Sequence, residues 1–128
     1  MSTEGVEPPL PRGFLRPAIL LLLRERPAHG YDLIERLRAL GFDRDDPGRL
    51  YRALRALEAD GLVRSAWEGS AGGPDRRVYE LTRSGMEELH SQAKMLVETE
   101  KALGTFLSRY SEFVTLDGRS RRRAASRR

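Results

Sequence analysis

The fold is decided by one stretch, residues 47–82, which reads PGRLYRALRALEADGLVRSAWEGSAGGPDRRVYELT. Its first part places Leu50, Leu54 and Leu57 at the spacing i, i+4, i+7, which is typical of the buried face of a helix. A proline opens this part and a glycine follows it, as expected at the two ends of a helix. The sequence therefore predicts a helix over residues 47–60.

The second part of the stretch predicts a β-hairpin. Residues 62–68 and 76–82 are rich in valine, tyrosine, tryptophan and threonine, a composition that favours strands. Residues 69–75 between them contain three glycines and a proline, which is typical of an exposed turn. We therefore expect a helix followed by a hairpin with a long tip.

The outward face of the predicted helix mixes arginines with very small residues. At about 100° per residue, Arg52 lies about 200° and Arg55 about 140° from Leu50, and Arg49 lies on one flank of the buried stripe. The small residues on the outward side are Gly48, Ala56 and Ala59. Such a surface allows a flat or grooved partner to approach closely.

Two further arginines, Arg76 and Arg77, follow the predicted turn. A guanidinium group binds phosphate in a bidentate manner, pairs with guanine and enters a narrow minor groove. Any single arginine on an exposed face can equally be a solvated surface charge. Arginines on both the helix and the hairpin favour a nucleic-acid interface.

Two segments before this stretch predict further helices. Residues 13–26 contain the apolar run AILLLL, which predicts a helix covered on more than one side. Residues 29–40 carry apolar side chains at helical spacing. Three helices followed by a hairpin make a winged helix-turn-helix domain over residues 13–82, mainly α with a small β-hairpin wing. The third helix of this fold enters the major groove of DNA.

Residues 83–116 predict one long C-terminal helix. Nine positions in it alternate spacings of three and four, and a seam of this length indicates association between helices. They are Met86, Leu89, Ala93, Leu96, Glu100, Leu103, Leu107, Tyr110 and Val114. Glu100 either sets the register of the seam or turns outward, with Val97 in its place. We therefore expect a dimerisation helix.

The two ends of the chain differ in composition from the rest. Residues 1–12 hold three prolines and are expected to be a disordered arm. The formal net charge is +4, and subtracting the six arginines of residues 119–128 leaves −2 for residues 1–118. We expect residues 117–128 to be a disordered basic tail, which either attracts phosphate without sequence preference or serves only as a solvated end.

Several functional classes find no support in the sequence. The chain has no cysteine and only two histidines, His29 and His90, so neither a metal site nor a thiol nucleophile is expected. His29 is expected to be a structural turn residue. No phosphate-binding loop or catalytic triad motif is present, and no secretory signal is found. We expect a cytoplasmic protein that is not an enzyme and has no cofactor.

The chain resembles the PadR family of transcriptional regulators. Three groups of residues carry the resemblance, which covers residues 14–89. They are His29-Gly30-Tyr31, then Pro47-Gly48-Arg49-Leu50-Tyr51-Arg52-Ala53-Leu54, and then Gly73-Pro74-Asp75-Arg76-Arg77-Val78-Tyr79-Glu80-Leu81-Thr82. Residues 57–63 and Gly85 complete the match.

The resemblance implies a homodimeric repressor that binds a palindromic DNA operator. The implied DNA-binding residues are Gly48, Arg49, Tyr51, Arg52, Arg55, Arg76 and Arg77. The implied dimer interface comprises Leu89, Ala93, Leu96, Leu103, Leu107 and Tyr110. Many family members also release DNA when a small aromatic or hydrophobic effector binds near the dimer interface. The family often has Ser or Thr where this chain has Arg49, so a contact by that hydroxyl group is replaced by a charge.

Some alternatives stay open at this stage. Tyr51 is expected to pack its ring while its hydroxyl group reaches a phosphate, and Tyr31 is expected to pack. Trp67 either packs on the hairpin or core, or lines an effector pocket together with Leu96. The alternative function is a winged helix that contacts an acidic protein partner and has no specific DNA site.

Overall fold

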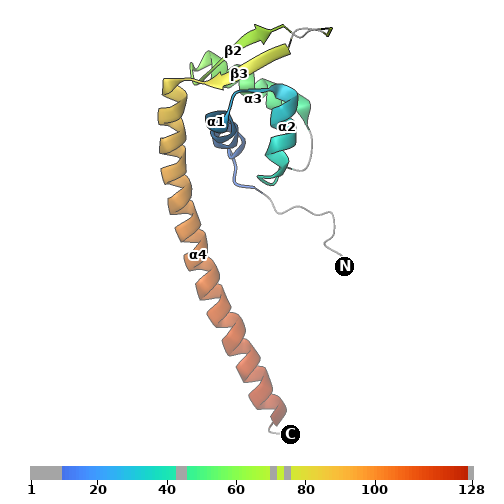
Figure 1. The fold of residues 1–128 in the computed structure, drawn as a ribbon. Coiled ribbons are helices and arrows are strands. Elements are labelled where there is room, and N and C mark those ends of the chain that lie inside the picture. Colours follow the sequence, from blue (N-terminus) through green and yellow to red (C-terminus); the bar gives the residue numbers. More distant parts are fainter. Residues whose placement is uncertain (1–9, 43–45, 70–71, 74–75, 127–128) are drawn as a thin grey trace. The chain divides into compact units, whose positions relative to one another are not determined.

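The computed structural model describes residues 10–42, 46–69, 72–73 and 76–126, and for residues 119–126 only the course of the backbone. The chain divides into two compact units, residues 1–92 and 93–128. Figure 1 shows the elements in their order along the chain. They are α1 (Leu15–Glu25), β1 (Ala28–His29), α2 (Gly30–Arg38), α3 (Pro47–Ala59), β2 (Val63–Glu68), β3 (Arg76–Leu81) and α4 (Arg83–Ser126). The expected helices and hairpin strands are confirmed to within two residues at most ends.

The hydrophobic core of the first unit forms around α1. This helix buries seven of its eleven residues, as expected from its apolar run, and only Leu21 among its leucines is exposed. The stripes of α2 and α3 close the core with Leu33, Leu37, Leu50, Leu54 and Leu57. Because α3 buries one face in this way, its opposite face is turned to solvent.

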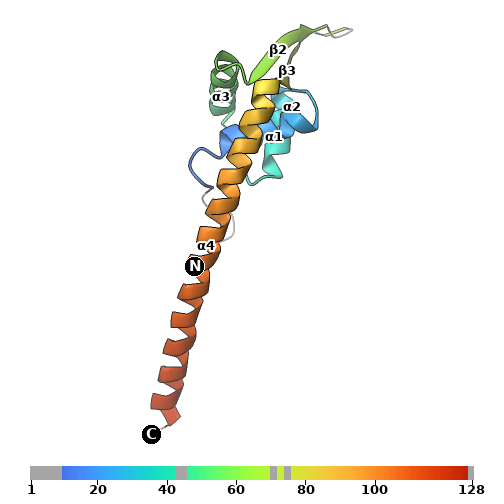
Figure 2. The same cartoon turned by 90° about the vertical axis from the view of Figure 1, so that its left-hand side faces the viewer.

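The sheet has three antiparallel strands in the order β1-β3-β2. In the wing, Val63 lies opposite Leu81 and Trp67 opposite Arg77. The third strand, β1, pairs Ala28 with Tyr79. The sequence did not predict β1, because two residues are too few to show the alternation typical of a strand. Figure 2 shows β2 and β3 extending together past the three helices of this unit.

Local polar contacts fix the start of α3 and of α4. The Asp46 carboxylate accepts a hydrogen bond from the Arg49 backbone N–H at 3.1 Å, which caps α3. The Thr82 hydroxyl group accepts from the Gly85 N–H at 3.0 Å and donates to the Gly61 carbonyl at 2.7 Å. The start of α4 is therefore attached to the turn that ends α3.

The length of α4 differs from the expectation. The helix was expected to end at residue 116 and to be followed by a disordered tail, but it continues to Ser126. Arginine and alanine, which are frequent in residues 119–126, are strong helix formers, and one glycine does not end a helix by itself. The expected arm at residues 1–12 lies mostly outside the described residues. In the part of the chain that the structure describes, no helix is long and apolar enough to cross a membrane.

Candidate nucleic-acid interface

The solvent-facing side of α3 presents the expected small and basic residues. Gly48, Arg49, Arg52 and Arg55 are all exposed. Arg52 lies 3.8 Å from the Asp46 carboxylate, with both side chains more than half exposed, and such surface pairs contribute little stability. Arg49 and Arg55 form no ion pair with another described residue. The α3 guanidinium groups are therefore available to a negatively charged partner.

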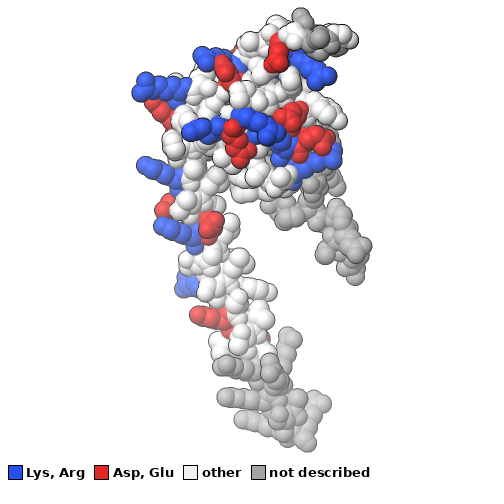
Figure 3. Space-filling model, in the orientation of Figure 1, with Lys and Arg blue, Asp and Glu red and all other residues white. Residues whose placement is uncertain are grey.

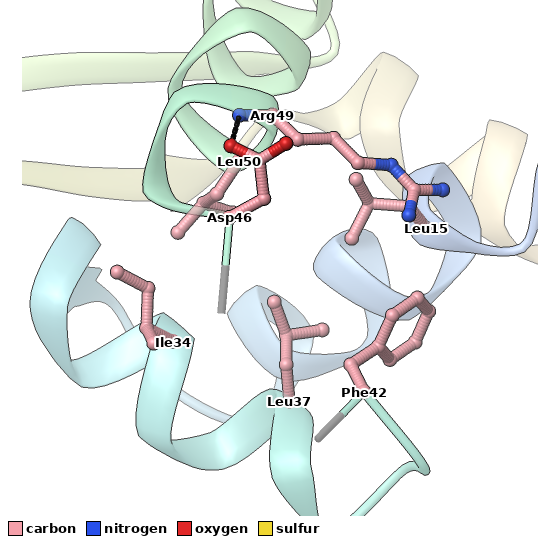
Figure 4. A pocket seen from close by; sticks show the side chains of 7 residues that line it. All are labelled: Leu15, Ile34, Leu37, Phe42, Asp46, Arg49 and Leu50. Carbon is pink, nitrogen blue, oxygen red and sulfur yellow. Dashed lines mark hydrogen bonds between the residues drawn. The ribbon is translucent and has the colours of Figure 1, made fainter. Parts of the chain in front are cut away.

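A small cavity lies beneath the start of α3. Its volume is about 40 Å³, and Leu15, Ile34, Leu37, Phe42, Asp46, Arg49 and Leu50 line it. Figure 4 shows the Arg49 side chain running toward Leu15 above the cavity, while its backbone N–H is bonded to Asp46. Ligand pockets usually have several hundred Å³, so this cavity is too small for an organic effector.

A larger open hollow of about 520 Å³ lies where α2, α3 and β3 meet. The residues that line it are His29, Gly30, Tyr31, Asp32, Tyr51, Arg76, Arg77 and Tyr79. Tyr31 is 72 % exposed, so the expectation that it packs was wrong: it lies in the first turn of α2, outside the buried face of that helix. A tyrosine that the sequence assigned to packing is thus available at the candidate interface.

The ring of Tyr51 packs on Gly30, as expected. A Cβ atom at residue 30 would lie 2.6 Å from the Tyr51 ring and hydroxyl oxygen, so only glycine permits this contact. Tyr51 itself is 37 % exposed. The His-Gly-Tyr sequence at the start of α2 therefore shapes the hollow by leaving room for the Tyr51 ring.

The two wing arginines differ in their surroundings. Arg77 donates from Nε to the Ser65 hydroxyl group at 2.7 Å, and its guanidinium carbon lies 5.5 Å from the centre of the Trp67 ring. Arg76 forms no ion pair with another described residue. Trp67 is 66 % exposed, so it is not a core residue but packs on the hairpin against Arg77. From the sequence, both arginines are expected to bind DNA. In the structure they differ, because Arg77 contacts Ser65 and Trp67 whereas Arg76 has no ion pair among the described residues.

The charges of this unit are mixed in sign. Figure 3 shows Lys and Arg side chains interspersed with Asp and Glu on the face it presents. One such pair in this unit is Arg16–Asp60, at 2.9 Å. Burial raises the pKa of the Tyr79 hydroxyl group, with nearby Arg77 opposing the shift and Glu58 adding to it. Tyr79 is therefore neutral at physiological pH. Attraction to DNA depends on the local arrangement of arginines and not on a uniformly basic surface.

The expected interface residues of α4 differ in exposure, with Ala93 exposed and Leu96 half-buried. Leu89 is partly buried and packs against the core of the first unit. Leu103, Leu107 and Tyr110 are more than half exposed. The pairing of Trp67 with Leu96 in an effector pocket stays a prediction, because the two residues belong to different units.

The histidines lie in structural positions or on the surface. His29 precedes α2 as its N-cap and pairs with Val78 in the sheet, which agrees with a structural role. His90 is exposed. Across residues 10–42, 46–69, 72–73 and 76–126, no group of three or more histidine, aspartate or glutamate side chains could hold a metal ion.

Comparison with known proteins gives consistent matches. Residues 19–91 match the family described as "Transcriptional regulator PadR-like family". Transcriptional regulator Rv3488 of Mycobacterium tuberculosis is 37 % identical over 91 residues, which cover 68 % of this chain and 83 % of that protein. Probable transcriptional regulator Rv1176c of the same organism is 38 % identical over 74 residues, 56 % of this chain but only 39 % of that protein.

The fold also matches solved structures. The crystal structure of Bacillus subtilis PadR in complex with operator DNA superimposes with a TM-score of 0.57 at 28 % identity. The match covers 62 % of this chain and 46 % of that chain. The similarity therefore lies in one part of that protein.

Proposed function

The chain belongs to the PadR-like family of transcriptional regulators, and on this basis we propose that it is a dimeric repressor that binds a two-fold symmetric DNA operator. Membership of a family of regulators also confirms that the chain is not an enzyme. The observation that carries the proposal is the exposed face of α3, where Arg52 and Arg55 lie on the same side as Gly48. Among the described residues Arg52 has only a solvent-exposed ion pair with Asp46 at 3.8 Å, and Arg55 has none.

The α3 arginines and the wing would both contact DNA, through phosphate groups and through base edges. Guanidinium groups on phosphates supply affinity and register, whereas one or two contacts to base edges supply specificity. Gly48 lets the backbone of α3 approach the groove because it has no side chain. The proposed contact set comprises Gly48, Arg49, Tyr51, Arg52, Arg55 and Arg76, with Tyr31 added from the structure. Arg77, which the resemblance also implies, is left out of the set because Ser65 and Glu58 already lie against its guanidinium group.

The hollow between α2, α3 and β3 supports the same assignment. Tyr31, Tyr51 and Arg76 are among the residues that line it. Hydroxyl and guanidinium groups are common donors to phosphate oxygens. A backbone phosphate of the operator seated there would connect the contacts of α3 with those of the wing.

Dimerisation is proposed from the exposed stripe of α4. Leu103, Leu107, Tyr110 and Val114 recur at spacings of three and four and are each more than half exposed. Burying such a seam against a second copy removes apolar surface from water, at about 25 cal/mol per Å². A homodimer would then present two copies of α3 to two half-sites. A small hydrophobic or aromatic effector would release the DNA if it bound more tightly to a dimer in which the two α3 helices have a different separation.

The experiment is binding of the purified protein to the DNA upstream of its own gene, with excess unrelated duplex as competitor. We expect a competitor-resistant complex that protects a symmetric site with half-sites about one helical turn apart. A variant that lacks residues 119–128 is the matched control for nonspecific attraction by the basic end. Complexes that competitor abolishes, and that vanish in this variant, would contradict the proposal and favour a protein partner.

A further inference from the structure

The side chains on the inner face of the wing become more exposed with distance from the core. Cross-strand neighbours share a face of a sheet, and the register pairs Val63 with Leu81, then Ser65 with Tyr79, then Trp67 with Arg77. Val63 and Tyr79 are buried, whereas Trp67 is mostly exposed. The outermost pair of this face therefore lies beyond the buried core.

A continuous set of polar contacts links this outer pair to α3. The Ser65 hydroxyl group donates to the Glu58 carboxylate, whose two oxygens lie 3.0 and 2.8 Å away. The same hydroxyl oxygen accepts a hydrogen bond from Arg77 Nε at 2.7 Å. Arg77 Nη2 also lies 3.9 Å from a Glu58 oxygen. We name Glu58, Ser65, Arg77 and Trp67 the wing brace.

We propose that Arg77 positions the wing on α3 through this brace and does not itself contact DNA. The proposal rests on the DNA-binding function proposed above. Arg77 already gives Nε to Ser65, faces the Glu58 carboxylate and covers the Trp67 ring. A phosphate bound to Arg77 Nε would displace Ser65, and one bound to Nη2 would compete with the Glu58 carboxylate and lie next to its negative charge.

Arg76 is the wing arginine that remains for DNA. Successive residues of a strand point to opposite faces, so Arg76 does not share the face that the brace holds. It forms no ion pair with another residue that the structure describes. The brace then sets the spacing between α3 and Arg76, which determines the phosphates and bases that both elements reach at once.

The first test uses two variants whose electrostatic effects are equal and whose structural effects differ. Glu58→Ala and Glu68→Ala each remove one negative charge near the proposed interface, which by charge alone should strengthen DNA binding. Glu68 is exposed, lies opposite Arg76 in the register and is outside the brace. We expect Glu68→Ala to bind the operator as tightly as the wild type or more tightly. We expect Glu58→Ala to bind about threefold to tenfold more weakly, the loss that follows from removing one partly exposed charged hydrogen bond.

The salt dependence of binding separates positioning from contact. Each phosphate contact contributes about −0.9 to the slope of log K against log salt. Arg76→Gln should lower the magnitude of the slope by about 1, whereas Arg77→Gln should weaken binding and leave the slope unchanged. Equal slope changes for the two variants, or tighter binding by Glu58→Ala, would overturn the proposal.

A measurement without DNA keeps the inference independent of the proposed function. Trp67 is the only tryptophan of the chain, so the fast phase of its fluorescence anisotropy decay reports local motion of the wing, while the slow phase reports tumbling of the protein. Glu58→Ala, and Ser65→Ala as a milder second variant, should increase local motion of Trp67, with circular dichroism confirming that the helices are intact. Unchanged Trp67 motion in both variants would refute the brace. Failure of the wild type to bind a symmetric site would refute the operator proposal alone.

Discussion

Replacing Gly85 by alanine should destabilise the protein, against the usual effect of this change in a helix. Alanine is favoured over glycine in a helix by about 1 kcal/mol. At Gly85, however, the new Cβ would lie 2.0 Å from the Leu62 carbonyl oxygen and 2.5 Å from Leu81 Cδ1. A backbone oxygen cannot move aside as the end of a flexible side chain can, so the start of α4 must shift.

The size of the effect follows from the contacts that this shift breaks. The Leu62 carbonyl accepts from the Thr82 N–H at 3.1 Å, and the Thr82 hydroxyl group bonds both Gly61 and Gly85. Losing two or three hydrogen bonds at about 1 kcal/mol each, less the gain in helix propensity, leaves a net loss of about 1–2 kcal/mol. This value lies within the range for overpacked sites, about 1–3 kcal/mol.

Urea unfolding followed by circular dichroism at a fixed protein concentration measures this loss. Gly104→Ala is the matched control in the same helix, because nothing lies within 4 Å of its added Cβ. Gly104→Ala should raise the free energy of unfolding by about 0.5–1 kcal/mol. If Gly85→Ala also raised it, the close approach of α4 to the turn after α3 would be wrong.

Three further predictions test the function and the core. Arg52→Ala should weaken operator binding by about 1–3 kcal/mol and leave the dimer intact in sedimentation. Leu107→Glu should lower the dimer fraction and operator binding together; a variant that stays dimeric would exclude Leu107 from the seam. Because burial raises the pKa of Tyr79, its contribution to stability is present below the unfolded pKa of about 10 and lost as pH rises above it. Tyr79→Phe should therefore flatten the fall in melting temperature at alkaline pH.

The regular elements could be predicted because each carries its own local pattern. The leucine spacing of α3 and the composition of the hairpin strands are properties of neighbouring residues, and both elements lie where the sequence predicts them. The strand β1 could not be predicted in this way, because its two residues become a strand only by pairing with β3. The end of α4 was also misjudged, since a run of arginines is compatible with both a disordered tail and a helix.

The sequence predicts which residues form the candidate site but not the role of each residue. Arg76 and Arg77 are adjacent and identical in sequence, so only the register of the hairpin and the position of Glu58 distinguish them. Tyr31 was assigned to packing because the sequence does not show whether another element covers the first turn of α2, outside the apolar stripe. In both cases the missing information is the direction of a side chain relative to an element distant in the chain.

The same contacts suggest how the end of α3 and the start of α4 are coupled. The turn after α3 supplies the Gly61 and Leu62 carbonyl groups, and Thr82 bonds both of them. The wing brace begins at Glu58, within one turn of the same helix end. The orientation of the wing and that of the first turn of α4 therefore share one support. A change that displaces this end of α3 would alter the wing and the start of α4 together, because both are bonded to residues close to it in the chain.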